Sequence, residues 1–180
     1  NNVIIGSGAG VQTHIDASHN TVVGDSAFGG DHDDSNQCHY NTVIGKDAMS
    51  GALDGVEGAT AIGHSALKAL TSGARNTVVG FESGVNATTA QDNVAIGYES
   101  MGGNVGTALT GTGNVVMGCY AGRDMQGAAE GNTLVGKDSG HALTTGNYNV
   151  LIGRDAGDSL VDETHNTAIG VDALGGSSAV

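Results

Sequence analysis

The sequence has no proline and no tryptophan, and only six of its 180 residues are aromatic. A globular domain of this length normally packs its core around large rings and leucines, so an ordinary globule is disfavoured. The core must instead be built from Ala, Val, Ile and Gly, and glycine alone accounts for 32 residues. Such small residues suit an extended repeating fold, in which each unit need only contact its neighbours.

Positive charge is also scarce. Six Lys and Arg stand against 19 Asp and Glu, which gives a net charge of −13 with His neutral. This balance disfavours binding to nucleic acid or anionic lipid and is compatible with solubility or cation binding. No run of about 18 apolar residues occurs, so we expect no membrane insertion. No signal peptide is visible and the chain begins with Asn, so we expect a segment of a longer or processed protein.

What the sequence does contain is a five-residue frame that ends in glycine and occurs ten times. The first copies are NVIIG at 2–6 and NTVVG at 20–24, and the last is NTAIG at 166–170. Consecutive copies are 17 to 21 residues apart, a period typical of solenoids. The glycines that end the frames, here called anchor glycines, are Gly6, Gly24, Gly45, Gly63, Gly80, Gly97, Gly118, Gly136, Gly153 and Gly170.

The spacings themselves repeat with a period of 73 residues, from Gly24 to Gly97 and again from Gly97 to Gly170. Loop sequences agree across this period, since ALTSG at 69–73 corresponds to ALTTG at 142–146. We therefore predict a single domain over 1–180, with four-coil blocks at 24–96 and 97–169 flanked by partial blocks.

The residues within each frame predict a short β-strand. Side chains alternate between the two faces of a strand, so Asn and the third residue share one face while the second and fourth residues share the other. Neither face carries a charge in any copy, which is typical of a strand covered on both sides. The opposite wall of the coil can cover one side, but the rest of each coil is too polar to cover the other.

We therefore predict an all-β parallel solenoid of about ten coils that associates with copies of itself. The frame strands would face a shared axis. The residues predicted to lie at this interface are Thr21, Val23, Thr42, Ile44, Thr60, Ile62, Thr77, Val79, Val94, Ile96, Val115, Met117, Thr133, Val135, Val150, Ile152, Thr167 and Ile169.

Further columns follow from aligning the frames. The anchor glycine predicts a sharp corner with positive φ, and the Asn residues predict a ladder of stacked amides. The third residue after the glycine is always Ala or Ser, which we interpret as a second short strand with a small side chain in the core. The residue before it is acidic in six coils, and we expect these carboxylates to lie in water, pair with Lys46, Lys137 and Arg154, or hold cations. The predicted amide ladder consists of Asn2, Asn20, Asn41, Asn76, Asn93, Asn114, Asn132, Asn149 and Asn166.

These coils resemble the left-handed parallel β-roll repeats in the heads of trimeric autotransporter adhesins. They are equally similar to the NTAIGxxAL…TTG repeats of bacteriophage tail fibres and related surface fibres. The resemblance runs from Asn2 to Ala173 and implies a parallel homotrimer whose aliphatic strands face the three-fold axis. It also implies an extracellular, cell-surface or virion location. The coils here are longer than those of adhesin heads, so we expect larger outer loops.

Two groups of side chains are candidate sites. Asp31, His32, Asp33 and Asp34 could bind Ca²⁺ or a transition metal, and apart from such an ion we expect no cofactor. The corresponding loop of the second block, 104–111, keeps none of these ligands, which favours a variable solvated loop. A second group precedes the frame Asn and could either stack on sugars or cap the edges between protomers. Its members are His19, Tyr40, Arg75, Tyr148 and His165.

The function predicted from these features is that of a stiff trimeric rod that presents its loops to a host or surface ligand such as a glycan. We expect no enzymatic activity, because the acidic residues recur in columns and form no unique constellation. Two alternatives stay open. A monomeric solenoid could bind ice or a mineral surface through its Thr column, and a glycan-cleaving tailspike could use carboxylates on a β-solenoid surface.

Overall fold

The computed structural model describes residues 1–10, 17–29, 38–102 and 106–176, and its regular elements are ten β-strands of three residues each. Each strand coincides with the middle three residues of one frame, so the frame locates every strand. The all-β prediction is confirmed. The strands are β1 (Val3–Ile5), β2 (Thr21–Val23), β3 (Thr42–Ile44), β4 (Thr60–Ile62), β5 (Thr77–Val79), β6 (Val94–Ile96), β7 (Val115–Met117), β8 (Thr133–Val135), β9 (Val150–Ile152) and β10 (Thr167–Ile169).

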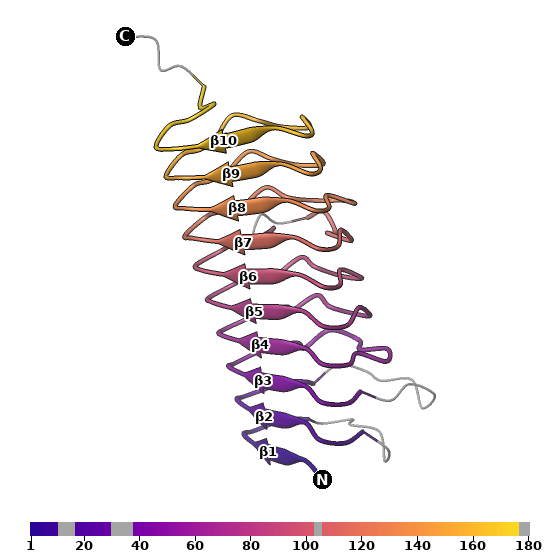
Figure 1. The fold of residues 1–180 in the computed structure, drawn as a ribbon. Coiled ribbons are helices and arrows are strands. Elements are labelled where there is room, and N and C mark those ends of the chain that lie inside the picture. Colours follow the sequence, from indigo (N-terminus) through magenta and orange to yellow (C-terminus); the bar gives the residue numbers. More distant parts are fainter. Residues whose placement is uncertain (11–16, 30–37, 103–105, 177–180) are drawn as a thin grey trace.

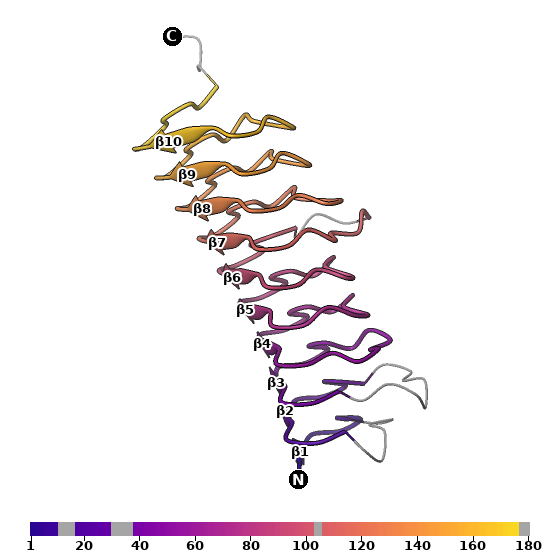
Figure 2. The same ribbon diagram turned by 45° about the vertical axis from the view of Figure 1, so that its right-hand side comes forward.

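All ten strands form one parallel sheet in chain order. Figure 1 shows them stacked from β1 beside the N-terminus to β10 at the far end, so the chain is a parallel β-solenoid. In Figure 2 the strands lie along one edge of the stack, and the rest of each coil extends away from them. With about 4.8 Å between neighbouring strands, the sheet is roughly 45 Å long.

Neighbouring frames pair residue for residue. Thr21 is opposite Thr42 and Val22 is opposite Val43, and the same register holds along the whole sheet. Equivalent residues therefore form straight columns along the rod. The third frame residue is the inward one, and its side chain is at most 5% exposed from β2 to β10. Ile4, in the first coil, is 40% exposed, because no coil covers it from below.

The anchor glycines form the corners at which the strands end. All ten have φ between 132° and 145°, a region that side-chain-bearing residues rarely adopt. Successive anchor glycines also stack backbone on backbone. A Cβ on any of the first nine would lie within 2.7 Å of the carbonyl carbon of the next one. Glycine is thus required here both by the backbone angle and by the lack of space.

The second short strand predicted after each anchor glycine is wrong. Its second residue has a left-handed φ in every coil, for example 56° at Asp47 and 50° at Glu82, so the backbone turns instead of extending. The turns nevertheless stack like strands, since the N–H of Asp155 donates to the carbonyl of Lys137 in the coil below at 2.9 Å. The small third residue is buried as expected, as Ala48 shows.

The core lies between the sheet and this stack of turns. Several of its largest side chains, among them Phe28, Met49 and Met101, come from the fourth position after the anchor glycine and are fully buried. Where that position is Gly84, the ends of Leu67 and Met101 from the adjoining coils lie 3.1 and 3.4 Å from the site of its missing Cβ. At this position the large side chains of adjoining coils therefore fill the space that a glycine leaves.

The two cysteines are unpaired, as expected from their separation by more than three coils. Cys38 is buried in the core, and burial raises the pKa of its thiol. Cys119 follows an anchor glycine and is partly exposed.

Candidate interaction surfaces

The outward face of the sheet is an uncharged surface that runs the length of the rod. It consists of the second and fourth residues of the frames, which are the residues that the sequence assigns to a protomer interface. In the single chain these side chains are partly open to solvent. Ile44 and Ile96 are each 37% exposed and Met117 is 39% exposed. An apolar patch of this continuity is a common mark of an interaction site.

One half of this face carries threonine. The parallel register places Thr21, Thr42, Thr60 and Thr77 directly beside one another on β2 to β5. Valine takes the same place on β6, β7 and β9, while Thr133 and Thr167 continue the column on β8 and β10. The face is therefore a row of hydroxyl and methyl groups beside a row of larger aliphatic groups.

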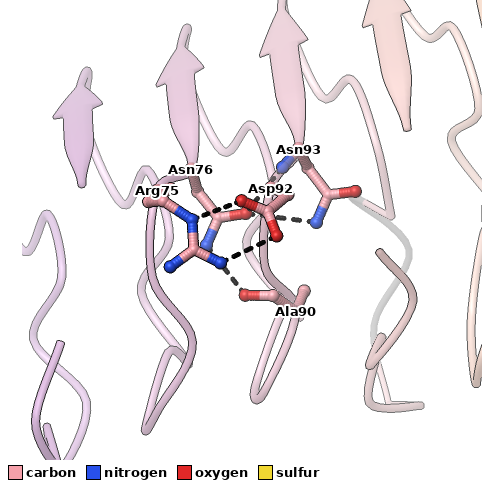
Figure 3. A network of polar contacts seen from close by, with 5 residues as sticks. All are labelled: Arg75, Asn76, Ala90, Asp92 and Asn93. Atoms are coloured by element: carbon pink, nitrogen blue, oxygen red, sulfur yellow. Dashed lines mark hydrogen bonds and ion pairs between the residues drawn. The ribbon is translucent and has the colours of Figure 1, made fainter. Parts of the chain in front are cut away.

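Behind the sheet, the frame asparagines form a ladder of buried amides. The Asn114 side chain is fully buried, and its Nδ2 donates both to Oδ1 of Asn93 at 3.0 Å and to the carbonyl of Ala129 at 2.9 Å. The backbone N–H of Asn114 also donates to Oδ1 of Asn93, at 2.9 Å. Figure 3 shows the equivalent rung at Asn76 and Asn93.

The fourth frame breaks this ladder, because Ala59 stands in place of Asn. The backbone N–H of Ala59 still donates to Oδ1 of Asn41 at 2.8 Å, but the coil supplies no amide of its own. The ladder therefore consists of one part from Asn2 to Asn41 and another from Asn76 to Asn166.

The residue before each frame forms a column that we call the leading column, because it lies where each strand begins. Its side-chain-bearing members have φ between 57° and 61°, and glycine takes the place in three coils. From the second coil onward the column is His19, Tyr40, Gly58, Arg75, Asp92, Gly113, Gly131, Tyr148 and His165.

The five ligand-binding candidates belong to this column but do not form one continuous stripe. The rings of His19 and Tyr40 stack with centroids 5.0 Å apart, and those of Tyr148 and His165 lie 5.2 Å apart. Arg75 instead binds Asp92 with two hydrogen bonds of 2.6 and 2.9 Å, which lower the pKa of the Asp92 carboxyl (Figure 3). The His19 and Tyr40 rings are stacked at 17°, so each covers one face of the other and leaves less ring surface for a sugar, whereas the Tyr148 and His165 rings are tilted by 39°.

The residue after each anchor glycine forms the trailing column, at the edge where the strands end. Sequence reasoning missed a row of aromatic rings that begins here. His64, Phe81 and Tyr98 stack with centroids 5.0 and 5.3 Å apart, and Tyr120 meets Tyr98 edge-on at 5.3 Å. Aligning this column would have revealed the first three rings. The trailing column is Asp25, Lys46, His64, Phe81, Tyr98, Cys119, Lys137, Arg154 and Val171.

The row is extended by charged neighbours. The Arg123 guanidinium lies 5.2 Å from the centroid of the Tyr120 ring, a distance suited to a cation–π contact. Arg123 Nε also lies 3.0 Å from a carboxylate oxygen of Glu99. The Tyr98 hydroxyl hydrogen-bonds to Glu99, and this bond raises the pKa of Tyr98 to about 12.

We expect Tyr98 to ionise well above the ordinary tyrosine pKa of 10.0. Only the neutral phenol can donate the hydrogen bond to Glu99, so ionisation breaks that bond. The contribution of this hydrogen bond to stability is therefore present below pH 10 and is lost as the pH rises through about 12. Tyrosinate absorbance measures this. Tyr98→Phe should remove a late-titrating step, and Glu99→Gln should move that step back toward 10.0. An unchanged titration in Glu99→Gln would contradict the assignment.

Most of the acidic residues that follow the anchor glycines are paired with basic side chains. Asp47 binds Lys46 at 3.0 Å, Asp155 binds Arg154 at 2.9 Å, and Asp138 binds Lys137. A hollow of about 210 Å³ lies beside two of these pairs, and it is lined by Asp138, His141, Asp155 and Asp158. Within the described residues, no three His, Cys, Asp or Glu side chains converge closely enough to hold a metal ion.

The other candidate metal ligands, Asp31, His32, Asp33 and Asp34, lie outside the described residues. His39, which follows them, is described, and its ring accepts a hydrogen bond from the backbone N–H of Ser18 at 3.2 Å. No helix long and apolar enough to cross a membrane occurs in the described ranges. Comparison of the chain with protein-family models, curated proteins and solved structures finds no match.

Proposed function

We propose that the chain is a structural and adhesive segment of an extracellular or virion fibre, and that it acts as a parallel homotrimeric left-handed β-roll. The observation that carries the proposal is the outward sheet face. It spans all ten strands without a charged residue, although the chain has a net charge of −13. Side chains such as Ile96 and Met117 remain more than a third exposed on it.

A second copy of the chain is the partner that best fits this face. A ladder of parallel strands repeats every ~4.8 Å, and a parallel copy presents the same apolar rows with the same repeat. Burying these rows removes aliphatic side chains from water along the whole rod. The resemblance to β-roll fibres favours three copies around an axis.

The adhesive part of the proposal concerns the rest of each coil. Outer loops differ from coil to coil, and a trimer presents each of them three times, which raises avidity for a repeated ligand such as a cell-surface glycan. The proposed role is not catalytic. The acidic residues recur in a column after the anchor glycines, where Asp47 and Asp155 are engaged by Lys46 and Arg154.

The native mass of the purified chain tests the trimer. Light scattering or native mass spectrometry at micromolar concentration should give a value near three times 17.7 kDa. Ile96→Lys puts a charge at the centre of the buried face and should yield monomers. Val161→Lys changes a similarly exposed apolar residue outside the strands and should leave the mass unchanged. A stable wild-type monomer would contradict the proposal.

The threonine column favours a second candidate function. Four successive threonines, Thr21 to Thr77, lie side by side in exact β register on an open face, a regular array suited to ice or a mineral surface. This function requires the face to stay in water, so a monomeric mass together with thermal hysteresis would support it. Turnover of a polysaccharide by the purified chain would contradict the non-catalytic role proposed here.

A further inference from the structure

We propose that in the trimer each trailing-column residue contacts the leading-column residue of the same coil in the neighbouring protomer. The proposal rests on the homotrimer proposed above and specifies which residues meet and at what axial register. The interaction surface is therefore the two edges of the sheet, and the partner is a second copy of this chain.

The geometry of a cyclic assembly brings these edges together. Within one chain the two columns lie at opposite ends of the strands, six residues apart, which is roughly 15–20 Å. In a closed ring of parallel copies the contact is heterologous, so the edge where strands begin on one protomer meets the edge where strands end on the next. The leading column of one copy must then lie alongside the trailing column of another.

The two columns match when coils of equal number are paired. Three of the pairs place a cation against an aromatic ring across the boundary, namely Lys46 with Tyr40, Arg75 with Phe81 and Arg154 with Tyr148. The three glycines of the leading column lie opposite His64, Cys119 and Lys137. No pair brings together like charges. The pairs are Asp25 with His19, Lys46 with Tyr40, His64 with Gly58, Phe81 with Arg75, Tyr98 with Asp92, Cys119 with Gly113, Lys137 with Gly131, Arg154 with Tyr148 and Val171 with His165.

Shifting one copy by a coil in either direction leaves one pair of a cation with a Tyr or Phe ring in place of three, Lys137 with Tyr148 in one direction and Arg75 with Tyr98 in the other. A shift in one direction places Arg154 against His165 and sets the Phe81 ring against the Asp92 carboxylate. A shift in the other direction places Lys46 against His19, and Cys119 then meets Asp92. Both shifts also set a Lys or Arg side chain against an imidazole in place of a tyrosine ring, and the paired edges then hold fewer favourable contacts.

A single substitution tests the register, because the chain already has Cys119 in the trailing column. Gly113→Cys adds its partner in the leading column of the same coil. The missing Cβ of Gly113 has no atom within 4 Å, and its φ of 68° resembles that of the side-chain-bearing members of the column. Cys38→Ala, present in every variant, removes the other thiol. Within one chain, positions 113 and 119 lie at opposite ends of a strand and are too far apart for a disulfide, which needs Cα atoms within about 7 Å.

We expect Gly113→Cys to give covalent trimers on a denaturing gel after mild oxidation or treatment with a short bis-maleimide. Asp92→Cys and Gly131→Cys place the new thiol one coil below and one coil above, which adds about 4.8 Å along the axis. At Gly131 the added side chain must displace the Tyr148 ring, which has an atom 2.6 Å from the site of the missing Cβ, so the native mass of both variants is checked before their cross-linking is compared. Their cross-linked fractions should be several-fold lower. The Cys38→Ala parent, which has only Cys119, should give no covalent trimer.

The native mass of each variant separates the two proposals. A mass of three chains with no cross-link in Gly113→Cys overturns the register but leaves the trimer intact. A mass of three chains with a stronger cross-link in Asp92→Cys or Gly131→Cys does the same and identifies the shifted register. A monomeric mass, or covalent products that stop at two chains in a dimeric sample, overturns both.

Discussion

Gly97→Ala should be among the most damaging single substitutions in the chain, lowering the free energy of unfolding by more than about 4 kcal/mol or preventing folding. Gly97 has φ of 142°, and an added Cβ would lie 2.6 Å from the carbonyl carbon of Gly118 and closer still to its oxygen. The obstacle is the backbone of the next coil, so no rotation of a side chain can relieve it. The coils would have to separate at this corner, which breaks the ladder on both sides.

Gly170→Ala is the matched control. Its φ is 132°, close to that of Gly97, but the nearest atom to an added Cβ is the Cβ of Ala173 at 3.8 Å. Gly170→Ala should therefore lower the free energy of unfolding only by the backbone strain, about 1–3 kcal/mol, because no neighbouring coil collides with its Cβ. Urea and thermal unfolding followed by circular dichroism, at equal protein concentration, compare the two. Equal losses in both variants would show that the stacking of anchor glycines contributes nothing beyond φ.

Asn114→Asp should produce the second large loss, more than about 3 kcal/mol at neutral pH. The amide of Asn114 donates to two buried oxygens, those of Asn93 and Ala129, and an ionised carboxylate would turn a negative charge toward both. Protonation removes that charge, so the pKa of the introduced carboxyl should be raised. Part of the lost stability should return as the pH falls through that raised pKa. Unfolding midpoints measured from neutral to acidic pH test this, with Asn114→Ala as the uncharged comparison.

Ala59→Asn makes the reverse test, because it fills the gap in the ladder. Position 59 corresponds to Asn132 across the 73-residue period, and Asn132 donates to Asn114 and to the carbonyl of Gly146. The new amide should find the same partners at Asn41 and Gly73, with a gain of about 1 kcal/mol. A loss of stability would mean that the first block cannot accommodate the amide that the second block holds.

The sequence was sufficient to locate the strands because a frame of fixed length pairs with itself in only one register. Its alternation also separated the inward column, such as Val43 and Leu134, from the outward one. The residues after the anchor glycine gave no comparable signal. Asp47 and Glu82 are compatible with an extended chain, and only the stacking of turns shows that they adopt left-handed angles.

The lateral contacts were harder still to predict. The aromatic row from His64 to Tyr120 crosses from one position of the coil to another, and the alignment by frames does not reveal that Tyr120 reaches Tyr98. The pairing of Arg75 with Asp92 likewise depends on both residues having nearly the same left-handed φ. Aligning the frames thus predicts which residues lie on the same edge of the sheet, but it does not predict the direction in which their side chains point.

Each strand pairs only with the strands before and after it in the chain. The ladder is open at both ends, so coils can be added or removed without changing the contacts within the remaining coils. Gain or loss of one 73-residue block would change the length of the rod by about 20 Å. The two strands that become adjacent at the junction would pair in the same register as every other pair of strands. Duplication of a block would therefore change the length of the rod and little else. The two similar blocks of this chain are the result expected from one such duplication.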